Sequence, residues 1–319
     1  MTSHLWIFLL FPGLPFLVLF FLGRRVLKER EAADRPFTSM RRPAGYSLQQ
    51  RADDQWDDVS TWLALTILTA FVPPIMFVAG EGKGLLGYLI VGTITSSILL
   101  HRLWKSFRPL PNYWLGLRGE QAVGGILDTL HGDHIAVFHD LEIKENGHSR
   151  NIDHLILTRC GVILVETKAR RKKRDVTGEK WKLKYDGKRI QFPDGCYDTD
   201  SLEQTIWNRE WLLRKTRAWT GGESIPILAV VTFPGWWVER TGKGEIRVNN
   251  PREIASLLDF ESRPLEEKTW KILQHQLETA CMIELESFKP KAGYRQAKKI
   301  ARVTAAGSTS KPEAAMAKT

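Results

Sequence analysis

The chain has 319 residues, a formal net charge of +10 and a sequence pI of about 9.5. This balance favours an anionic partner, either nucleic acid or an anionic membrane surface, and does not choose between them. The three cysteines, Cys160, Cys196 and Cys281, are too few for a disulfide scaffold, match no zinc motif and fit a reducing compartment. No glycine-rich phosphate loop is present, so no nucleotide cofactor is expected.

The first hundred residues predict membrane-spanning helices. The segment 1–23 consists mostly of an apolar run without charge. This run has the length of a bilayer-spanning helix, about 20 residues. A signal peptide is the alternative, but no Lys or Arg precedes the run, which favours an anchor. Two further apolar runs, separated by a short turn, predict a transmembrane hairpin over 61–101, against the alternative of two buried helices in a soluble domain. The segment 24–60 is charged and mixed in sign, which predicts a loosely ordered loop.

The positions of Lys and Arg predict how these spans are oriented. Positive side chains follow the first span and the third span directly, at Arg24, Arg25, Lys28 and Arg30 and at Arg102 and Lys105. By the positive-inside rule, the N-terminus lies outside, and both the 24–60 loop and everything after about residue 102 are cytoplasmic. We therefore expect a multi-pass protein of a bacterial inner membrane.

The rest of the chain alternates helical and strand patterns. In order, we expect a helix near 118–130, strands near 135–140, 150–158 and 161–168, a helix near 201–218, a strand near 226–233 and a short helix begun at Pro251. This order predicts an α/β fold with a central mixed sheet.

Two apolar, β-branched segments separated by a short turn predict a hairpin that carries two acids and a lysine. If the loop is Arg159–Cys160, Asp153 lies directly opposite Glu166. A loop at Cys160–Gly161 keeps both carboxyl groups on one face, whereas a three-residue loop separates them. Glu166 and Lys168 share a face in every register. Such a group is either a divalent-metal site with a catalytic lysine or a set of solvated charges at a strand end.

Four elements in order give this hairpin a context. Gly119-Glu120 opens a helix, Ile152-Asp153-His154 lies in a strand, Glu166-Thr167-Lys168 ends the next strand, and Gln204 lies in a later helix. Over about residues 113–260 this order resembles the nuclease-related domain, known as NERD. The resemblance implies the PD-(D/E)XK superfold, that is, a restriction-endonuclease-like α/β domain.

The resemblance also implies roles for these residues. Asp153 and Glu166 would bind Mg²⁺ or Mn²⁺, and Glu120 would add an acidic ligand from the first helix. Lys168 would orient or help to deprotonate the attacking water and steady the phosphate charge. Gln204 would brace the site from the second helix.

A dense basic run follows Lys168, made of Arg170, Arg171, Lys172, Lys173 and Arg174. Beside a phosphodiesterase site, these side chains could neutralise nucleic-acid phosphates without selecting a sequence. A solvated loop and contact with anionic lipid headgroups are the alternatives.

The C-terminal part predicts one more helix and a tail. Residues 265–288 have amphipathic helical spacing, which would close the domain or pair with another chain as a homo-oligomer. Residues 289–319 are basic and rich in Ala, Ser and Thr, which predicts a disordered tail.

Our first functional hypothesis is a membrane-anchored, metal-dependent nuclease with a cytoplasmic catalytic domain, acting on DNA in preference to RNA. The alternatives are a non-catalytic module that binds nucleic acid or organises a membrane assembly, and a phosphoester hydrolase acting on lipid headgroups. Turnover with oligonucleotide and liposome substrates separates the three.

Overall fold

The computed structural model describes residues 21–25, 39–71, 75, 85–145, 148–173, 178–261 and 263–284. Its contacts divide the chain into a large unit, which contains 41–283, and a small unit made of 20–40 and 284–319. In the small unit, residues 21–25 are helical. The rest of the predicted first span, residues 1–20, and the predicted tail, 289–319, lie outside the described residues.

A five-stranded mixed sheet forms the centre of the large unit, as the sequence predicts. Its strand order is β10-β8-β4-β3-β2, and β4 pairs antiparallel with β3 and parallel with β8. The strands are β2 (Ala136–Glu145), β3 (His148–Thr158), β4 (Gly161–Thr167), β8 (Ile227–Thr232) and β10 (Arg247–Asn249). Every residue of β4 is buried, because this apolar, β-branched strand is covered on both faces.

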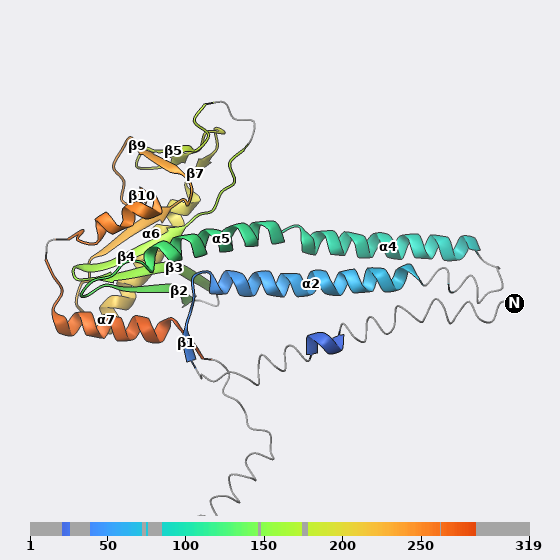
Figure 1. Cartoon of the computed structure of the whole chain (residues 1–319), viewed down its shortest axis with the longest axis horizontal. Coiled ribbons are helices and arrows are strands. Elements are labelled where there is room, and N and C mark those ends of the chain that lie inside the picture. The colour runs from blue at the N-terminus through green and yellow to red at the C-terminus, as the bar shows by residue number, and fades with distance from the viewer. Residues whose placement is uncertain are drawn as a thin grey trace, which may run out of the picture. The chain divides into compact units, whose positions relative to one another are not determined.

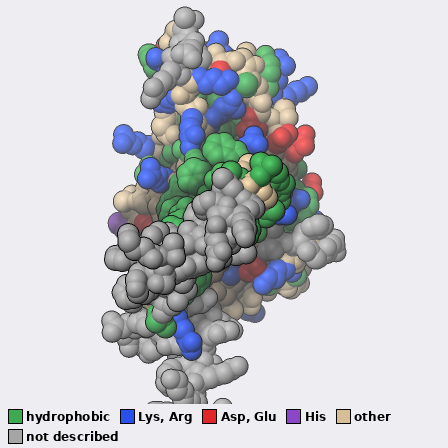
Figure 2. Space-filling model, turned by 90° about the vertical axis from the view of Figure 1, so that its right-hand side faces the viewer, with side chains coloured by type: hydrophobic (Ala, Val, Ile, Leu, Met, Phe, Trp, Pro, Cys, Tyr) green, Lys and Arg blue, Asp and Glu red, His purple; other side chains and the backbone are tan. Residues whose placement is uncertain are grey.

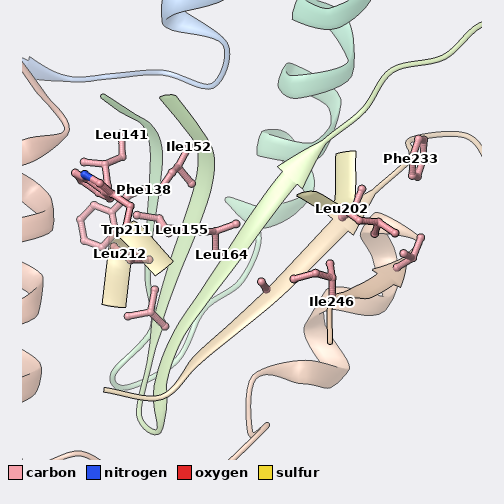
Figure 3. Close-up of a cluster of buried hydrophobic side chains, with 14 of the residues drawn as sticks. Phe138, Leu141, Ile152, Leu155, Leu164, Leu202, Trp211, Leu212, Phe233 and Ile246 are labelled. Carbon is pink, nitrogen blue, oxygen red and sulfur yellow. The ribbon is translucent and has the colours of Figure 1, made fainter. Parts of the chain in front are cut away.

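Helices cover both faces of this sheet. On one face lie α5 (Leu110–Leu127) and the 3-10 helix η1 (Pro251–Leu257), over a cluster that includes Ile163 and Val165. On the other face, α6 (Asp200–Trp219) packs over a larger cluster that contains Leu155 and Leu164. Figure 3 shows Phe138, Leu141, Trp211 and Leu212 gathered beside the strands in this second cluster.

Two of the predicted helices have other limits in the structure. The helix α5 begins at Leu110 and ends at Leu127, earlier at both ends than the expected 118–130. The helix α7 (Glu267–Ala280) is shorter than the expected 265–288, because the chain turns at Cys281 and continues as β11 (Met282–Glu284). Residues from 285 onward lie outside the described part.

A second, smaller sheet was not expected. It has the order β7-β6-β5-β9 and comprises β5 (Lys182–Tyr185), β6 (Ile190–Gln191), β7 (Tyr197–Asp198) and β9 (Trp237–Arg240). Its strands are only two to four residues long, so they carry little periodic signal. This sheet therefore gives regular structure to parts of the region 182–198, where no element was predicted.

The N-terminal part of the large unit differs most from expectation. Residues 46–60 are not a loop, because α2 runs without a break over Tyr46–Ala70. Its charged first half is rich in good helix formers, and the buried Ala52 and Val59 give it a face to pack, which the low apolar content concealed. A strand, β1 (Ser39–Arg41), comes before it.

The predicted set of several transmembrane helices is also corrected. Within the described residues, only the helical stretch from Leu86 to Leu127 is long and apolar enough to cross a membrane. It consists of α4 (Leu85–Phe107) followed by α5. The expected hairpin over 61–101 corresponds to the end of α2 and to α4, while 72–74 and 76–84 lie outside the described residues.

Within the large unit, α2 runs beside α4 and α5 (Figure 1). The guanidinium of Arg102 on α4 lies 5.9 Å from the ring centre of Trp62 on α2. Gly45 begins α2 with a φ of 78°, and a Cβ there would lie 2.6 Å from Leu117 Cδ1 of α5. Only glycine therefore allows both this backbone angle and this close approach of α2 to α5.

Candidate active site

The β3–β4 hairpin has the two-residue loop, the first of the three alternatives. Thr158 pairs with Gly161 and His154 pairs with Val165, so Arg159 and Cys160 form the turn. Continuing this register by one step places Asp153 opposite Glu166. The carboxyl group of Asp153 also accepts a hydrogen bond of 2.7 Å from the backbone N–H of Thr167. The hairpin alone therefore brings the two acids to one face of the sheet.

Glu166 is bound by three side chains. Lys168 Nζ and Gln204 Nε2 each donate to Glu166 Oε1 at 2.8 Å, and Asn208 Nδ2 donates to Oε2 at 3.1 Å. Lys168 also donates to Gln204 Oε1 at 2.9 Å. Gln204 and Asn208 are four residues apart on α6, and this spacing puts both amides on the same face of the helix. Glu166, Lys168 and Gln204 therefore meet, as the sequence predicts.

Glu120 approaches the same centre from α5. The preceding residue, Gly119, allows the helix to lie against the end of β4, since a Cβ there would be 2.7 Å from the Ala169 side chain. Glu120 is buried, and its Oε2 has no hydrogen-bond partner among the described residues. Burial raises the pKa of Glu120 to about 8, and the nearby charges of Asp140 and Glu166 act in the same direction.

The pKa values of the other titratable groups also reflect the negative charge gathered at this site. Burial raises the pKa of Asp153 well above its usual value, and the charges of Glu166 and Glu120 add to this. Burial also raises the pKa of Glu166, against the opposing effect of Lys168. For Lys168, burial opposes the charged form, but the Glu166 carboxylate outweighs it and raises the pKa. Lys168 therefore donates its hydrogen bonds to Glu166 and Gln204 as an ammonium.

The donor chemistry of the site suits a hard cation only in part. Carboxylate oxygens are the ligands that Mg²⁺ prefers, and the partnerless Oε2 of Glu120 has no competing hydrogen bond. Both oxygens of Glu166, however, are engaged by protein donors. No group of three His, Cys, Asp or Glu side chains converges on one point among the residues that the structure describes. The acids therefore fit a cation that keeps several waters and takes one or two carboxylates.

The basic run after Lys168 is held by the protein itself. Arg170 and Lys173 form ion pairs with Asp194, at 3.1 and 3.0 Å. Arg171 donates to the carbonyl of Pro111 and Lys172 to that of Gly235. These four side chains therefore have internal partners, while Arg174 lies outside the described residues.

Sequence reasoning missed two groups around the site. Asn208 could have been found from its position one helical turn after Gln204. On the opposite face of the sheet, His154 Nδ1 lies 2.8 Å from His139 Nδ1, and His139 Nε2 lies 2.9 Å from Asp128 Oδ1. No spacing in the sequence indicates the contact between His139 and His154, because these two residues meet only through the pairing of β2 with β3.

Fold and site together define a mixed α/β domain with two acids and a lysine at the end of a central hairpin. Residues 115–234 match the family model of the nuclease-related domain, NERD, and this part of the chain is therefore a nuclease-related domain. The match lies within the range 113–260 that the sequence motifs predict. No curated protein and no solved structure matches the chain.

Proposed function

We propose that this protein is a membrane-anchored, Mg²⁺- or Mn²⁺-dependent nuclease, with DNA as its preferred substrate. The observation that carries the proposal is the meeting of Asp153, Glu166 and Lys168 at one end of the central hairpin, inside a nuclease-related domain. Burying acids costs free energy, and acids buried beside a lysine gather at binding and catalytic sites.

The reaction would be hydrolysis of a phosphodiester. A water oxygen forms a new bond to phosphorus, the ester P–O bond breaks, and a phosphomonoester and a hydroxyl group result. Lys168 would donate to a phosphate oxygen and neutralise charge in the transition state, while Gln204 and Asn208 hold Glu166 in place. One or two of the carboxylates of Glu120, Asp153 and Glu166 would hold the divalent ion, which when bound supplies Lewis-acid stabilisation and lowers the pKa of water.

Membrane anchoring is supported by the surface of α4. Large apolar side chains project from it unburied, among them Leu86, Leu89, Ile90, Val91, Ile94 and Ile98. Figure 2, which faces the ends of α2 and α4, shows hydrophobic side chains in the centre of the view and Lys and Arg side chains around and above them. Arg102, Lys105 and Arg108 follow the apolar part of α4. By the positive-inside rule these side chains favour a cytoplasmic nuclease-related domain.

Cleavage by the full chain in detergent micelles tests the proposal. Labelled DNA and RNA are incubated with Mg²⁺, with Mn²⁺ or with EDTA. We expect DNA cleavage that EDTA abolishes and that Glu166→Gln and Lys168→Ala each reduce by about 100-fold or more. The matched control is Glu210→Gln, because Glu210 is an exposed acid on α6. Cleavage that persists in Glu166→Gln, or in EDTA, contradicts this mechanism.

One observation favours a second candidate, a module that binds nucleic acid without cutting it. Glu166 Oε1 accepts from Lys168 and Gln204 and Oε2 accepts from Asn208, so protein donors occupy most of the acceptor capacity of this acid. This candidate predicts salt-dependent binding of oligonucleotides without turnover under any metal condition. The same cleavage assay, with binding measured in parallel, decides between the two.

A further inference from the structure

A groove opens beside the acidic centre and shares Gln204 with it. Its volume is about 540 Å³, and its lining comes from three elements: α2, β3 and α6. The lining residues are Arg51, Arg150, Asn151, Asp200, Glu203, Gln204 and Trp207. A volume of this size lies in the range of ligand-binding sites in proteins.

Two arginines supply the positive charge of this groove. Arg51 and Arg150 are both exposed, and neither forms an ion pair with any described residue. Burial is the largest cause of the raised pKa of Glu120, and Arg51 is among the charges that lower this pKa. Arg51 therefore lies within electrostatic reach of the site. The run at 170–173 has internal partners, whereas the guanidinium groups of Arg51 and Arg150 remain available for phosphate oxygens.

Trp207 fixes one of these arginines. The guanidinium of Arg150 lies 4.7 Å from the ring centre of Trp207, within the range of a cation–π contact. Trp207 is partly buried against the core, so it provides a rigid base for Arg150. On the same helix, the exposed acids Asp200 and Glu203 line the groove. Their charge would repel a second phosphate backbone, which favours a single strand on the arginine side.

Arg51 is fixed by the docking of α2. In the first turn of this helix, the backbone N–H and the hydroxyl of Ser47 donate to Asp140 Oδ2 at 3.2 and 2.6 Å. Asp140 is fully buried, and its Oδ1 accepts from Asn151 Nδ2 of the groove at 2.9 Å. A helix outside residues 115–234 therefore carries a cation to the mouth of the nuclease-related domain.

We propose that Arg51 and Arg150 form a phosphate-binding subsite that holds a single strand of nucleic acid next to the scissile bond. The substrate class of this subsite rests on the proposed function. The subsite adds the residues that bind the strand and the preference for a single strand. Because α2 supplies Arg51, a fragment limited to the nuclease-related domain lacks half of the subsite. The helix pair that carries the apolar surface therefore also takes part in substrate binding.

The test measures binding by the full chain in detergent micelles, with EDTA present so that no strand is cut. Fluorescent single-stranded DNA and the matched duplex are titrated at several salt concentrations. Arg51→Ala and Arg150→Ala should each weaken single-strand binding by about tenfold and lower the slope of log affinity against log salt by about one. Arg51→Lys, which keeps the charge, should recover part of the affinity. Arg217→Ala, an exposed arginine at the far end of α6, should change neither quantity.

Several outcomes overturn the proposal. Single-strand affinity unchanged in both alanine variants would do so, as would duplex binding that is tighter and equally sensitive to Arg51. Arg51-dependent binding to anionic lipid vesicles without binding to DNA would assign the arginines to the membrane surface instead.

The two proposals fail in different ways. Loss of binding in Arg51→Ala, with no cleavage by the wild type under any metal condition, removes the nuclease and keeps the subsite. Metal-dependent cleavage by the wild type, with full affinity in Arg51→Ala, keeps the nuclease and removes the subsite.

Discussion

At the β3–β4 hairpin, the acids Asp153 and Glu166 are only 6% and 1% exposed, whereas on α4 the apolar Leu86 and Val91 are 72% and 64% exposed. Water favours the opposite arrangement in both places, since burying charge and exposing apolar surface each cost free energy. Both arrangements make sense when a partner completes them. A cation and a phosphate suit the first region, and the acyl chains of lipids suit the second.

Equal substitutions in the two regions should have unequal effects. Leu164→Ala removes a fully buried side chain from the central strand and should lower the free energy of unfolding by about 2–5 kcal/mol. Leu89→Ala on the exposed face of α4 should change it by about 0.5 kcal/mol or less. Thermal unfolding in detergent, followed by tryptophan fluorescence, measures both. Equal losses would show that the Leu89 side chain is packed against protein.

A charge placed on α4 tests the lipid side of the comparison. Ile94→Asp should oppose membrane insertion by about 3 kcal/mol, which is on the order of a 100-fold shift toward the soluble fraction. Membrane and soluble fractions of expressing cells give the distribution by quantitative immunoblotting. His275→Asp, at an exposed position of α7, is the matched control and should leave the distribution unchanged. If Ile94→Asp stays in the membrane fraction, α4 is not the span.

Asp140 tests whether the two regions are joined. Asp140→Ala leaves the Ser47 and Asn151 donors without their acceptor and should destabilise the protein by about 1–3 kcal/mol. Asp140→Asn should cost less, because Asn tolerates the φ of 55° found there and keeps one acceptor oxygen. Thermal unfolding measures the loss, with Asp133→Ala, an exposed acid, as the control. No loss in Asp140→Ala would mean that α2 is held by other contacts.

Glu120 provides a test that depends on pH. Its folded-state pKa of about 8 exceeds the unfolded value of 4.5, so only the folded state keeps the proton between them. In EDTA, stability should therefore fall as pH rises from about 4.5 to about 8. Glu120→Gln should make this decline smaller and raise the stability at the upper end, while Asp153 and Glu166, whose pKa values are also raised, still contribute to the decline. Melting temperatures across this pH range test it.

Mg²⁺ provides the matched comparison for Glu120. In the wild type at pH 8, the ion should raise the melting temperature, because a ligand bound only by the folded state stabilises it. The increase should be smaller in Glu120→Gln. Equal increases in the two proteins would contradict a role for Glu120 in holding the ion.

The strands and the acidic hairpin could be predicted from the sequence because their signals are local. A buried β-branched run such as Gly161–Thr167 has few alternatives, and the period of two assigns Glu166 and Lys168 to one face. Asp153 lies on the same face because the hairpin loop has two residues, and only the structure determined the length of that loop. The order of the motifs predicted a nuclease-related segment over about 113–260, and the family model matches residues 115–234.

Other features depended on contacts between distant segments. The charged start of α2 has little apolar content. This helix is stable because it bonds to Asp140 and packs against α5. The sequence does not show that Asp194 and backbone carbonyls bind the basic run at 170–173, since a charge pairs with whatever the fold brings near, and contact of this run with nucleic acid stays a prediction. Arg51 and Arg150 gave no signal in the sequence. Local pattern thus determined which residues lie on the hairpin, and only tertiary packing determined which charges remain free beside it.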